Sequence, residues 1–239
     1  MMNHKNIAVG GFTLVELLIA MAVSGIVMAA VMTSFLSQHD SYLVQDNVVE
    51  MQQNIRVAME LFTSEIRMAG YNPTHDISVG IVTATGGRLG FTQDLNGDGD
   101  TNDANEAITY GFADSNDATT DGIADTGNAP FGRNTGTADG VGGSGFQPIS
   151  ENFQAVEFYY LMADGTRTLA PAATALDDIR GIQISLLARA AQADSKFTNT
   201  TIYTSASGAH WGGAGGTPYN DQFRRRLLIT TIQCRNLGL

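Results

Sequence analysis

Carboxylate and amide side chains alternate with other residues in one short segment, which is the part of the sequence best suited to chemistry. They stand at Asp94, Asn96, Asp98, Asp100 and Asn102, and Glu106 follows. Hard divalent cations prefer such oxygen ligands. Residues 94–106 hold five acidic side chains within 13 residues, which would repel one another without a cation. The pattern therefore predicts a cation site in this loop.

The first half of this loop resembles the calcium loop of EF-hand proteins. Asp94, Asn96 and Asp98 fall at positions 1, 3 and 5, and Gly99 is the turn glycine at position 6. Asp100 stands at position 7, where the pattern uses a backbone carbonyl. The resemblance implies that calcium is the bound cofactor.

The second half of the loop departs from the EF-hand pattern. Asn102 falls at position 9, but position 12 is Asn105 and Glu106 is at position 13. Either the loop has one extra residue or Glu106 closes the site with one oxygen. Because strands and not helices are predicted on both sides, this would be a calcium loop on a hairpin. A solvated turn is the alternative, since turns favour the same residue types.

A second stretch, residues 117–128, has a degenerate version of the same spacing and no closing acidic residue. We therefore expect an ordinary loop there. The four histidines, His4, His39, His75 and His210, lack the spacing of a zinc site. No nucleophile or phosphate-loop motif is present, so the sequence does not predict an enzyme.

The charge of the chain argues against a nucleic-acid partner. Its formal net charge is -11, whereas binding to phosphates requires Lys and Arg. The one basic cluster, Arg224–Arg226, is expected to face carboxylates or another subunit. The single cysteine, Cys234, cannot form an internal disulfide and is expected to be a small buried residue.

Residues 12–36 form an apolar run that contains one charged side chain, Glu16. As a helix this run is about 37 Å long, which is enough to cross a bilayer core of about 30 Å. It is too long for a secretory signal peptide, and the Gly10-Gly11 pair precedes it. An ordinary signal anchor would leave Glu16 unexplained, because a carboxylate in a membrane is costly.

The stretch Gly11-Phe12-Thr13-Leu14-Val15-Glu16 resembles the type IV prepilin processing motif. The resemblance implies that residues 1–11 are a leader and that a prepilin peptidase cleaves between Gly11 and Phe12. It also implies N-methylation of Phe12 and pairing of Glu16 with the terminal amine of a neighbouring subunit. The alternative for Glu16 is a carboxylate that reaches the lipid headgroups.

The remaining elements follow from the spacing of apolar residues. Residues 37–70 predict an amphipathic helix with one apolar stripe, which Gly70 and Pro73 end. Residues 71–239 predict a β-rich head that contains loop 94–106 and long polar loops at 113–147 and 194–221. Strands are expected at 80–84, 88–92, 107–112, 153–162, 181–188 and 225–234. The predicted fold is α+β and pilin-like, with a long N-terminal helix packed on an antiparallel sheet.

Several further segments resemble PilW-type minor pilins, which are relatives of the J-type pseudopilins of type II secretion. They are residues 64–73, the aspartate-rich loop with 106–110, residues 152–160, and the end of the chain at 224–237. The resemblance implies a low-copy subunit that helps to initiate a pilus at its tip with other minor pilins. It also implies an inner-membrane assembly platform as a partner, with the head in the periplasm before assembly and outside the cell afterwards.

Three other functions remain open on the sequence alone. The chain could be a major shaft pilin, a pseudopilin of type II secretion, or a calcium-dependent adhesin at a pilus tip.

Overall fold

The computed structural model describes residues 11–75, 77–136, 145–213 and 216–237; the predicted leader lies outside them except for Gly11. The chain divides into two compact units, residues 1–46 and 47–239. Helix α1 (Leu14–Ile66) contributes to both units, and each unit is described by itself.

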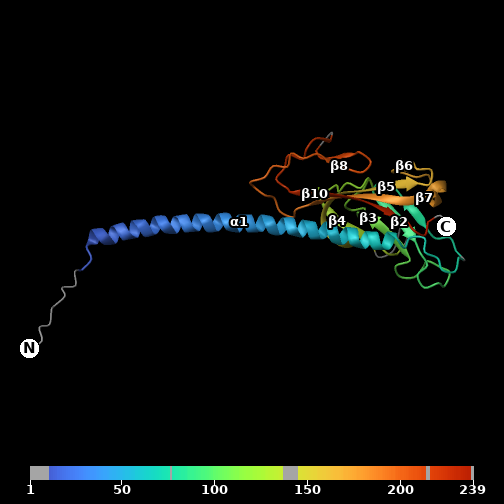
Figure 1. Ribbon diagram of the computed structural model, residues 1–239, viewed down its shortest axis with the longest axis horizontal. Helices are drawn as coiled ribbons and strands as arrows, with labels where there is room; N and C mark the ends of the chain where they lie inside the picture. The colour runs from blue at the N-terminus through green and yellow to red at the C-terminus, as the bar shows by residue number, and fades with distance from the viewer. Residues whose placement is uncertain (1–10, 76, 137–144, 214–215, 238–239) are drawn as a thin grey trace, which may run out of the picture. The chain divides into compact units, whose positions relative to one another are not determined.

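The described part of the first unit is the beginning of α1, drawn in blue in Figure 1. Leucine, alanine, methionine and valine dominate its early turns, and no proline interrupts them. The apolar side chains from Leu14 to Leu36 are exposed, and none of the residues of this unit that the structure describes is buried. The unit therefore has no core of its own.

The second unit begins with the last turns of α1, which bury one face against the sheet. Met51, Ile55, Ala58, Phe62 and Ile66 are buried, at spacings of three and four residues. Met59 is buried as well. The helix ends at Ile66, three residues before the end of the predicted stripe. Its final turn tightens there, because the N–H groups of Met68 and Ala69 donate to the carbonyls of Glu65 and Ile66.

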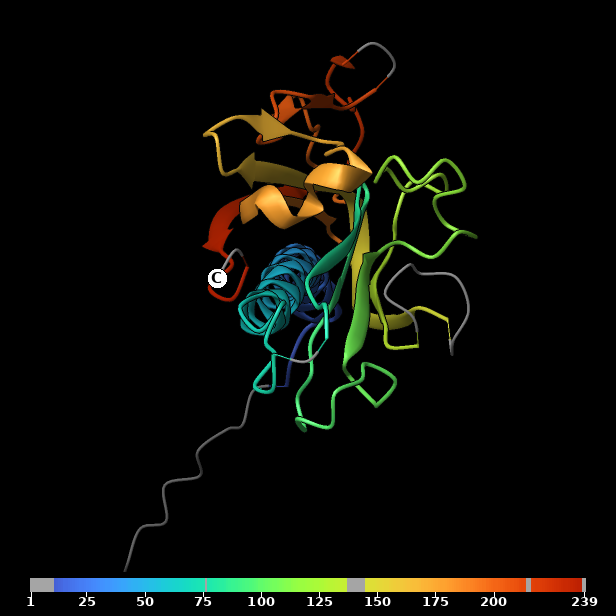
Figure 2. The same cartoon turned by 90° about the vertical axis from the view of Figure 1, so that its right-hand side faces the viewer.

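The head is an antiparallel sheet whose main path runs β1-β2-β3-β4-β5-β7-β10, with β6 paired to β5. Figure 2 shows these strands around α1, with β10 on one side of the helix and the green strands on the other. The strands are β1 (Ile81–Ala84), β2 (Arg88–Thr92), β3 (Ala107–Gly111), β4 (Ala129–Asn134), β5 (Gln147–Met162), β6 (Arg167–Thr168), β7 (Ile179–Arg189) and β10 (Arg225–Gln233). The predicted α+β fold, a long N-terminal helix whose later turns pack on an antiparallel sheet, is confirmed.

The two edges of this sheet differ. Strand β1 has four residues, and its register with β2 shifts between Ile81 and Thr83. Strand β10 has nine residues and pairs with β7 without interruption from Arg225 to Gln233. No described residue pairs with the other side of β10.

Aromatic side chains fill the core between α1 and the sheet. The ring of Phe62 lies 5.1 Å from that of Tyr110, edge to face, and 5.6 Å from that of Phe158. Tyr110 stacks in turn on Phe91 and Phe131. Burying each such side chain contributes about 1.5–3 kcal/mol to folding, so these rings fix where the helix lies on the sheet.

A loop segment crosses the outer face of the sheet and carries the short pair β8 (Tyr203–Thr204) and β9 (His210–Trp211). The buried carboxylate of Glu157 on β5 holds this segment. It accepts hydrogen bonds from the hydroxyl of Ser205 at 2.8 Å and from the N–H and hydroxyl of Ser207 at 3.0 and 2.7 Å. Trp211 packs beside it on Ala155 and Leu187.

Candidate functional site

The first turn of α1 is closed by a reciprocal pair of hydrogen bonds. The N–H and the hydroxyl of Thr13 both donate to Glu16 Oε2 at 2.9 Å, and the N–H of Glu16 donates to Thr13 Oγ1 at 3.2 Å. This is a capping box, which satisfies donors that have no partner at the start of a helix. The Thr-x-x-Glu spacing signals such a cap, and our sequence analysis missed it.

The predicted cleavage residues precede this cap. Gly11 and Phe12 lie in a stretch without regular structure, and the side chain of Phe12 is 93% exposed. A Cβ at Gly11 would meet no described atom within 4 Å. The bond between these residues is therefore open to an enzyme, as far as the described residues show.

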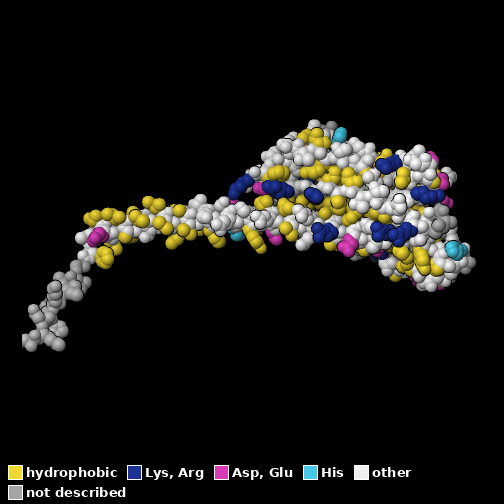
Figure 3. All heavy atoms as spheres, viewed as in Figure 1, with side chains coloured by type: hydrophobic (Ala, Val, Ile, Leu, Met, Phe, Trp, Pro, Cys, Tyr) yellow, Lys and Arg dark blue, Asp and Glu magenta, His cyan; other side chains and the backbone are white. Residues whose placement is uncertain are grey.

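Helix α1 is also the one helix in the described ranges that is long and apolar enough to cross a membrane. Its most apolar 18-residue window has none of its residues buried. Figure 3 shows this surface as yellow side chains along the helix. An apolar surface of this size requires lipid or other helices as its partner.

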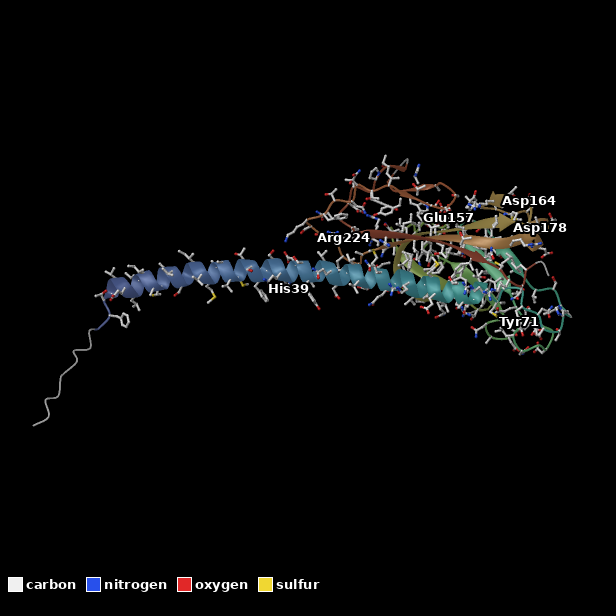
Figure 4. All side chains as sticks on the ribbon, in the orientation of Figure 1. His39, Tyr71, Glu157, Asp164, Asp178 and Arg224 are labelled. Atoms are coloured by element: carbon white, nitrogen blue, oxygen red, sulfur yellow. The ribbon has the colours of Figure 1, made fainter. Side chains whose placement is uncertain are left out.

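The acidic loop joins β2 to β3 and is held by two buried carboxylates. Asp94 is 0% exposed; its oxygens accept the N–H groups of Gly97 at 2.6 Å and Gly99 at 3.2 Å. Both glycines have positive φ, 78° and 85°, which side-chain-bearing residues adopt with strain. The N–H of Asp94 donates to the carbonyl of Tyr71, which Figure 4 labels at this end of the head.

Glu106 closes the loop from its other end. It is 1% exposed; its Oε1 accepts the N–H groups of Leu95 at 2.8 Å and Asn96 at 3.4 Å, and its Oε2 accepts that of Asp103 at 3.4 Å. Asn105 turns away, with φ 70°, and its Oδ1 accepts a hydrogen bond from Arg133. The residue at position 13, not position 12, therefore faces the loop.

Three of the predicted ligands converge. One carboxylate oxygen each from Asp98, Asp100 and Glu106 lies within 4.8 Å of the others. Oxygens around one calcium ion lie no more than about 5 Å apart, twice the metal–oxygen distance. The chemistry and spacing of these three side chains therefore fit a calcium ion.

The other predicted ligands have different roles in this arrangement. Asp94 directs both oxygens at glycine N–H groups. Asn96 donates its amide to Asp98 at 2.9 Å and to Asp103 at 2.7 Å, and the N–H of Asn102 donates to Asp100 Oδ1 at 2.9 Å. Asp94 thus shapes the loop, while Asn96 cross-links its acidic side chains.

Comparison with known proteins identifies the N-terminal segment. Residues 8–32 match the family model described as the prokaryotic N-terminal methylation motif. The matched residues include the cap of α1 and the exposed apolar turns that follow it. The motif therefore stands at the start of a long apolar helix whose later turns pack on an antiparallel sheet.

Other comparisons are distant. A type IV-like pilin from Thermus thermophilus is similar at 14% sequence identity and a TM-score of 0.46, over 79% of this chain and 98% of that one. The search of curated proteins found no match.

The second acidic loop is held by contacts between carboxylates and backbone N–H groups. Asp117 is 1% exposed and accepts the N–H groups of Asp121 at 3.1 Å and Gly122 at 2.8 Å. The Oδ2 of Asp125 accepts the N–H of Ala118. Among the described residues, no set of three acidic oxygens converges here. Asp117 thus shapes this loop as Asp94 shapes the first one.

The basic cluster divides into paired and unpaired residues. Arg224 forms an ion pair with Asp194 at 2.8 Å, and Arg225 forms one with Asp221. These hydrogen bonds lower the pKa of both carboxyl groups, although partial burial opposes the shift. Arg226 is exposed and has no ion pair with any residue in the described ranges. Figure 4 labels Arg224 above α1.

Neither the described histidines nor the cysteine forms a reactive site. His39 lies on α1 beside Phe35, His75 lies in the turn after the helix, and His210 contacts the hydroxyl of Thr204. Cys234 is buried, which raises the pKa of its thiol to about 12. His4 lies outside the described residues.

Sequence reasoning missed a polar network that joins α1 to the acidic loop. Arg133 donates through Nε to Glu65 Oε2 at 2.8 Å and through Nη2 to Asn105 Oδ1 at 2.9 Å. The hydroxyl of Tyr110 also donates to Glu65. Burial, and then the charge of Glu65, raise the pKa of Tyr110. Arg133 therefore links Asn105, the residue before Glu106, to Glu65 near the end of α1.

Proposed function

We propose that this pilin-like chain is a minor type IV pilin, a low-copy subunit that helps to initiate or cap a filament. A prepilin peptidase cleaves between Gly11 and Phe12 and methylates Phe12. The apolar part of α1 holds the chain in the inner membrane, with its head in the periplasm, and later stacks among the helices of the filament, near its tip. The observation that carries this proposal is the methylation motif placed at the start of an exposed apolar helix.

In this proposal Glu16 pairs with the methylated terminal amine of a neighbouring subunit. A carboxylate inside a membrane costs about 2.5–3.5 kcal/mol on insertion scales, and an opposite charge relieves much of that cost. The capping box occupies Glu16 Oε2 and holds this exposed carboxylate in the first turn of the helix, three residues after Thr13. Contacts with other pilins and with the inner-membrane assembly platform follow from the same role.

A low-copy position is favoured over the shaft by the resemblance to PilW-type minor pilins. A shaft pilin would dominate sheared filaments. A pseudopilin would be revealed by a secretion defect without loss of surface pili. Quantifying this chain in sheared filaments separates a minor pilin from a shaft pilin. We expect this chain to be a small fraction of the total pilin.

The test of processing and stacking is mass spectrometry of the chain from membranes and from sheared filaments. We expect an N-terminus at Phe12 with one methyl group. Glu16→Gln is expected to lower incorporation into filaments by more than tenfold, while Glu50→Gln, an exposed carboxylate later in α1, leaves it unchanged. A chain that starts at Met1, or normal incorporation of Glu16→Gln, would overturn the proposal.

We further propose that loop 94–106 binds calcium through Asp98, Asp100 and Glu106, with the carbonyl or side-chain oxygens of Asn96 and Asn102 completing the shell. Asp94 orients the loop. The support is the convergence of three carboxylate oxygens within 4.8 Å. A calcium-dependent adhesin is the second candidate function. Loss of surface binding without loss of pili after Asp98→Asn would favour it.

Calcium binding is tested by the thermal midpoint of the full chain with calcium and with chelator. Ligand at a hundredfold excess over its dissociation constant stabilises by about 2.7 kcal/mol. We expect Asp98→Asn combined with Asp100→Asn to remove the shift. Asp121→Asn in the second acidic loop should retain it. An equal midpoint with calcium and with chelator in the unaltered chain would contradict the site.

A further inference from the structure

A groove of about 550 Å³ lies between the last turns of α1 and the edge strand β10. Its floor is apolar, formed by Ile55 and Met59 of the helix and Leu228 of the strand. Figure 3 shows yellow apolar surface between the helix and the sheet, with dark blue basic side chains on both sides. The groove lies wholly within the second unit of the chain.

The rim of the groove is basic. Arg56, Arg67 and Arg226 line it, and Glu60 is the one acidic residue among its lining residues. All three arginines are exposed, and none forms an ion pair with another residue in the described ranges. A cluster of three unpaired arginines is unusual in a chain with a net charge of -11. A ligand that complements this rim carries carboxylates.

The wall of the groove is an open strand edge. An edge strand presents unpaired N–H and C=O groups that can pair with another chain, and proteins normally shorten, bend or cover such edges. Strand β1, at the opposite edge of this sheet, is short and its register with β2 shifts, so it has two of these protections. Strand β10 is long and regular, contains no proline, and has an exposed Ile229 in its middle. Among the described residues, β10 therefore lacks the shortness and the shifted register that protect the opposite edge.

The groove borders the first half of β10. Arg226 and Leu228, near its start, line the groove with residues from Gln52 to Arg67. After its end, the side-chain amide of Asn236 donates to the carbonyl of Arg67 at 3.2 Å. An extended segment beside β10 would therefore follow the helix and pass the arginines in turn.

We propose that this groove binds an extended, acidic segment of a partner protein, which adds as a strand to the edge of β10 and sets its carboxylates against Arg56, Arg67 and Arg226. Main-chain hydrogen bonds supply affinity, and the arginines and the apolar floor select the sequence. This surface is lined by the later turns of α1 and by β10, and not by the apolar turns that the proposed stacking uses.

The probe is a fluorescent nine-residue peptide of alternating Glu and Val, which matches the length of β10. Its anisotropy is measured with the full chain in detergent micelles. We expect saturable binding that weakens with salt. The same peptide with Gln for Glu should bind at least tenfold more weakly, and a peptide with N-methyl groups on alternate residues should not bind. Equal binding of the Glu and Gln peptides would overturn the charge selection, and binding of the N-methylated peptide would overturn the strand pairing.

Charge exchange tests the groove itself. Arg67→Glu combined with Arg226→Glu should weaken the Glu peptide by at least tenfold and should create binding of a Lys and Val peptide, which a misfolded head could not gain. Arg167→Glu, the same change at an exposed position of β6, should alter neither affinity. Loss of binding in the Arg167→Glu control, or no effect in the groove variant, would overturn the proposal. A third result would also overturn the proposal: the peptide does not bind, and the chain forms concentration-dependent dimers that Arg226→Glu abolishes. The occupant of the groove would then be a second copy of this chain.

Discussion

The beginning and the end of α1 have the same backbone conformation but different partners. From Leu14 to Asp46 none of the residues is buried, whereas the turns from Asn47 to Ile66 bury six side chains in the head. Local helix propensity therefore does not distinguish the two parts. The later part finds its apolar partner within the chain, and the earlier part must find one in lipid or in other subunits.

The sharpest test of this difference deletes a large side chain from each part. Phe62→Ala removes a ring that is 0% exposed, so we expect it to destabilise the head by about 3–5 kcal/mol. Val31→Ala, at an exposed position, should change the stability of the isolated chain by less than about 0.5 kcal/mol. Urea unfolding of the full chain in detergent, followed by Trp211 fluorescence, measures both. Equal losses of unfolding free energy in the two variants would mean that the two parts of α1 do not differ in packing.

The next effect concerns the polar attachment of the later part. Arg133→Met leaves the largely buried carboxylate of Glu65 with one partner fewer, and we expect a loss of about 1–3 kcal/mol in the same unfolding experiment. Asp114→Asn is the comparison variant, because the Asp114 carboxylate that pairs with Arg88 is 75% exposed and stays hydrated, whereas that of Glu65 is 20% exposed. A larger cost for the control would show that the Glu65 network does not hold the helix.

A smaller effect is expected at the start of the earlier part. Thr13→Val removes the hydroxyl of the capping box, and helix caps contribute about 0.5–2 kcal/mol. Amide hydrogen exchange over Leu14–Leu17 should become faster, while exchange in the head stays unchanged. Ser41→Ala removes a hydroxyl that donates to the carbonyl of Ser37 within the helix, and it should not affect the first turn.

The smallest effect is a difference in response to acid. The pKa values of Asp194 and Asp221 are lowered by their bonds to Arg224 and Arg225. Their stabilisation is therefore complete above the ordinary value of 3.8 and is lost as the pH falls through the lowered values. We expect the environment of Trp211 to change below about pH 4 before helicity falls. Asp194→Asn should reduce the change at Trp211. Simultaneous loss of the Trp211 signal and of helicity would contradict this prediction.

Most elements of the fold could be predicted because their residues carry a local pattern. The stripe from Met51 to Ile66 predicted the packed helix face, and short β-prone runs predicted β2, β3, β7 and β10. Strand β4 was missed because Pro130 and Gly132 lie within it. It exists through its pairing with β3 and β5, which is a tertiary effect. The early start of β5, at Gln147 instead of Phe153, has the same origin.

The candidate sites were predictable to the extent that their residues are close in sequence. The motif at Gly11–Glu16 and the acidic loop are local, and the structure brings Asp98, Asp100 and Glu106 together. The choice between Asn105 and Glu106 needed the backbone, since φ at Asn105 decides which side chain faces inward. The contact of Arg133 with Glu65 joins residues 68 positions apart, and no local pattern indicates such a pair.

The burial of Cys234 has a practical consequence for experiments on assembly. With a pKa of about 12, its thiol is almost wholly protonated near neutral pH, and the sheet covers it. A cysteine introduced on the exposed turns of α1, such as Val31→Cys, would therefore be the only readily labelled thiol in the folded chain. Neighbouring subunits could be mapped by cross-linking with the natural cysteine left in place.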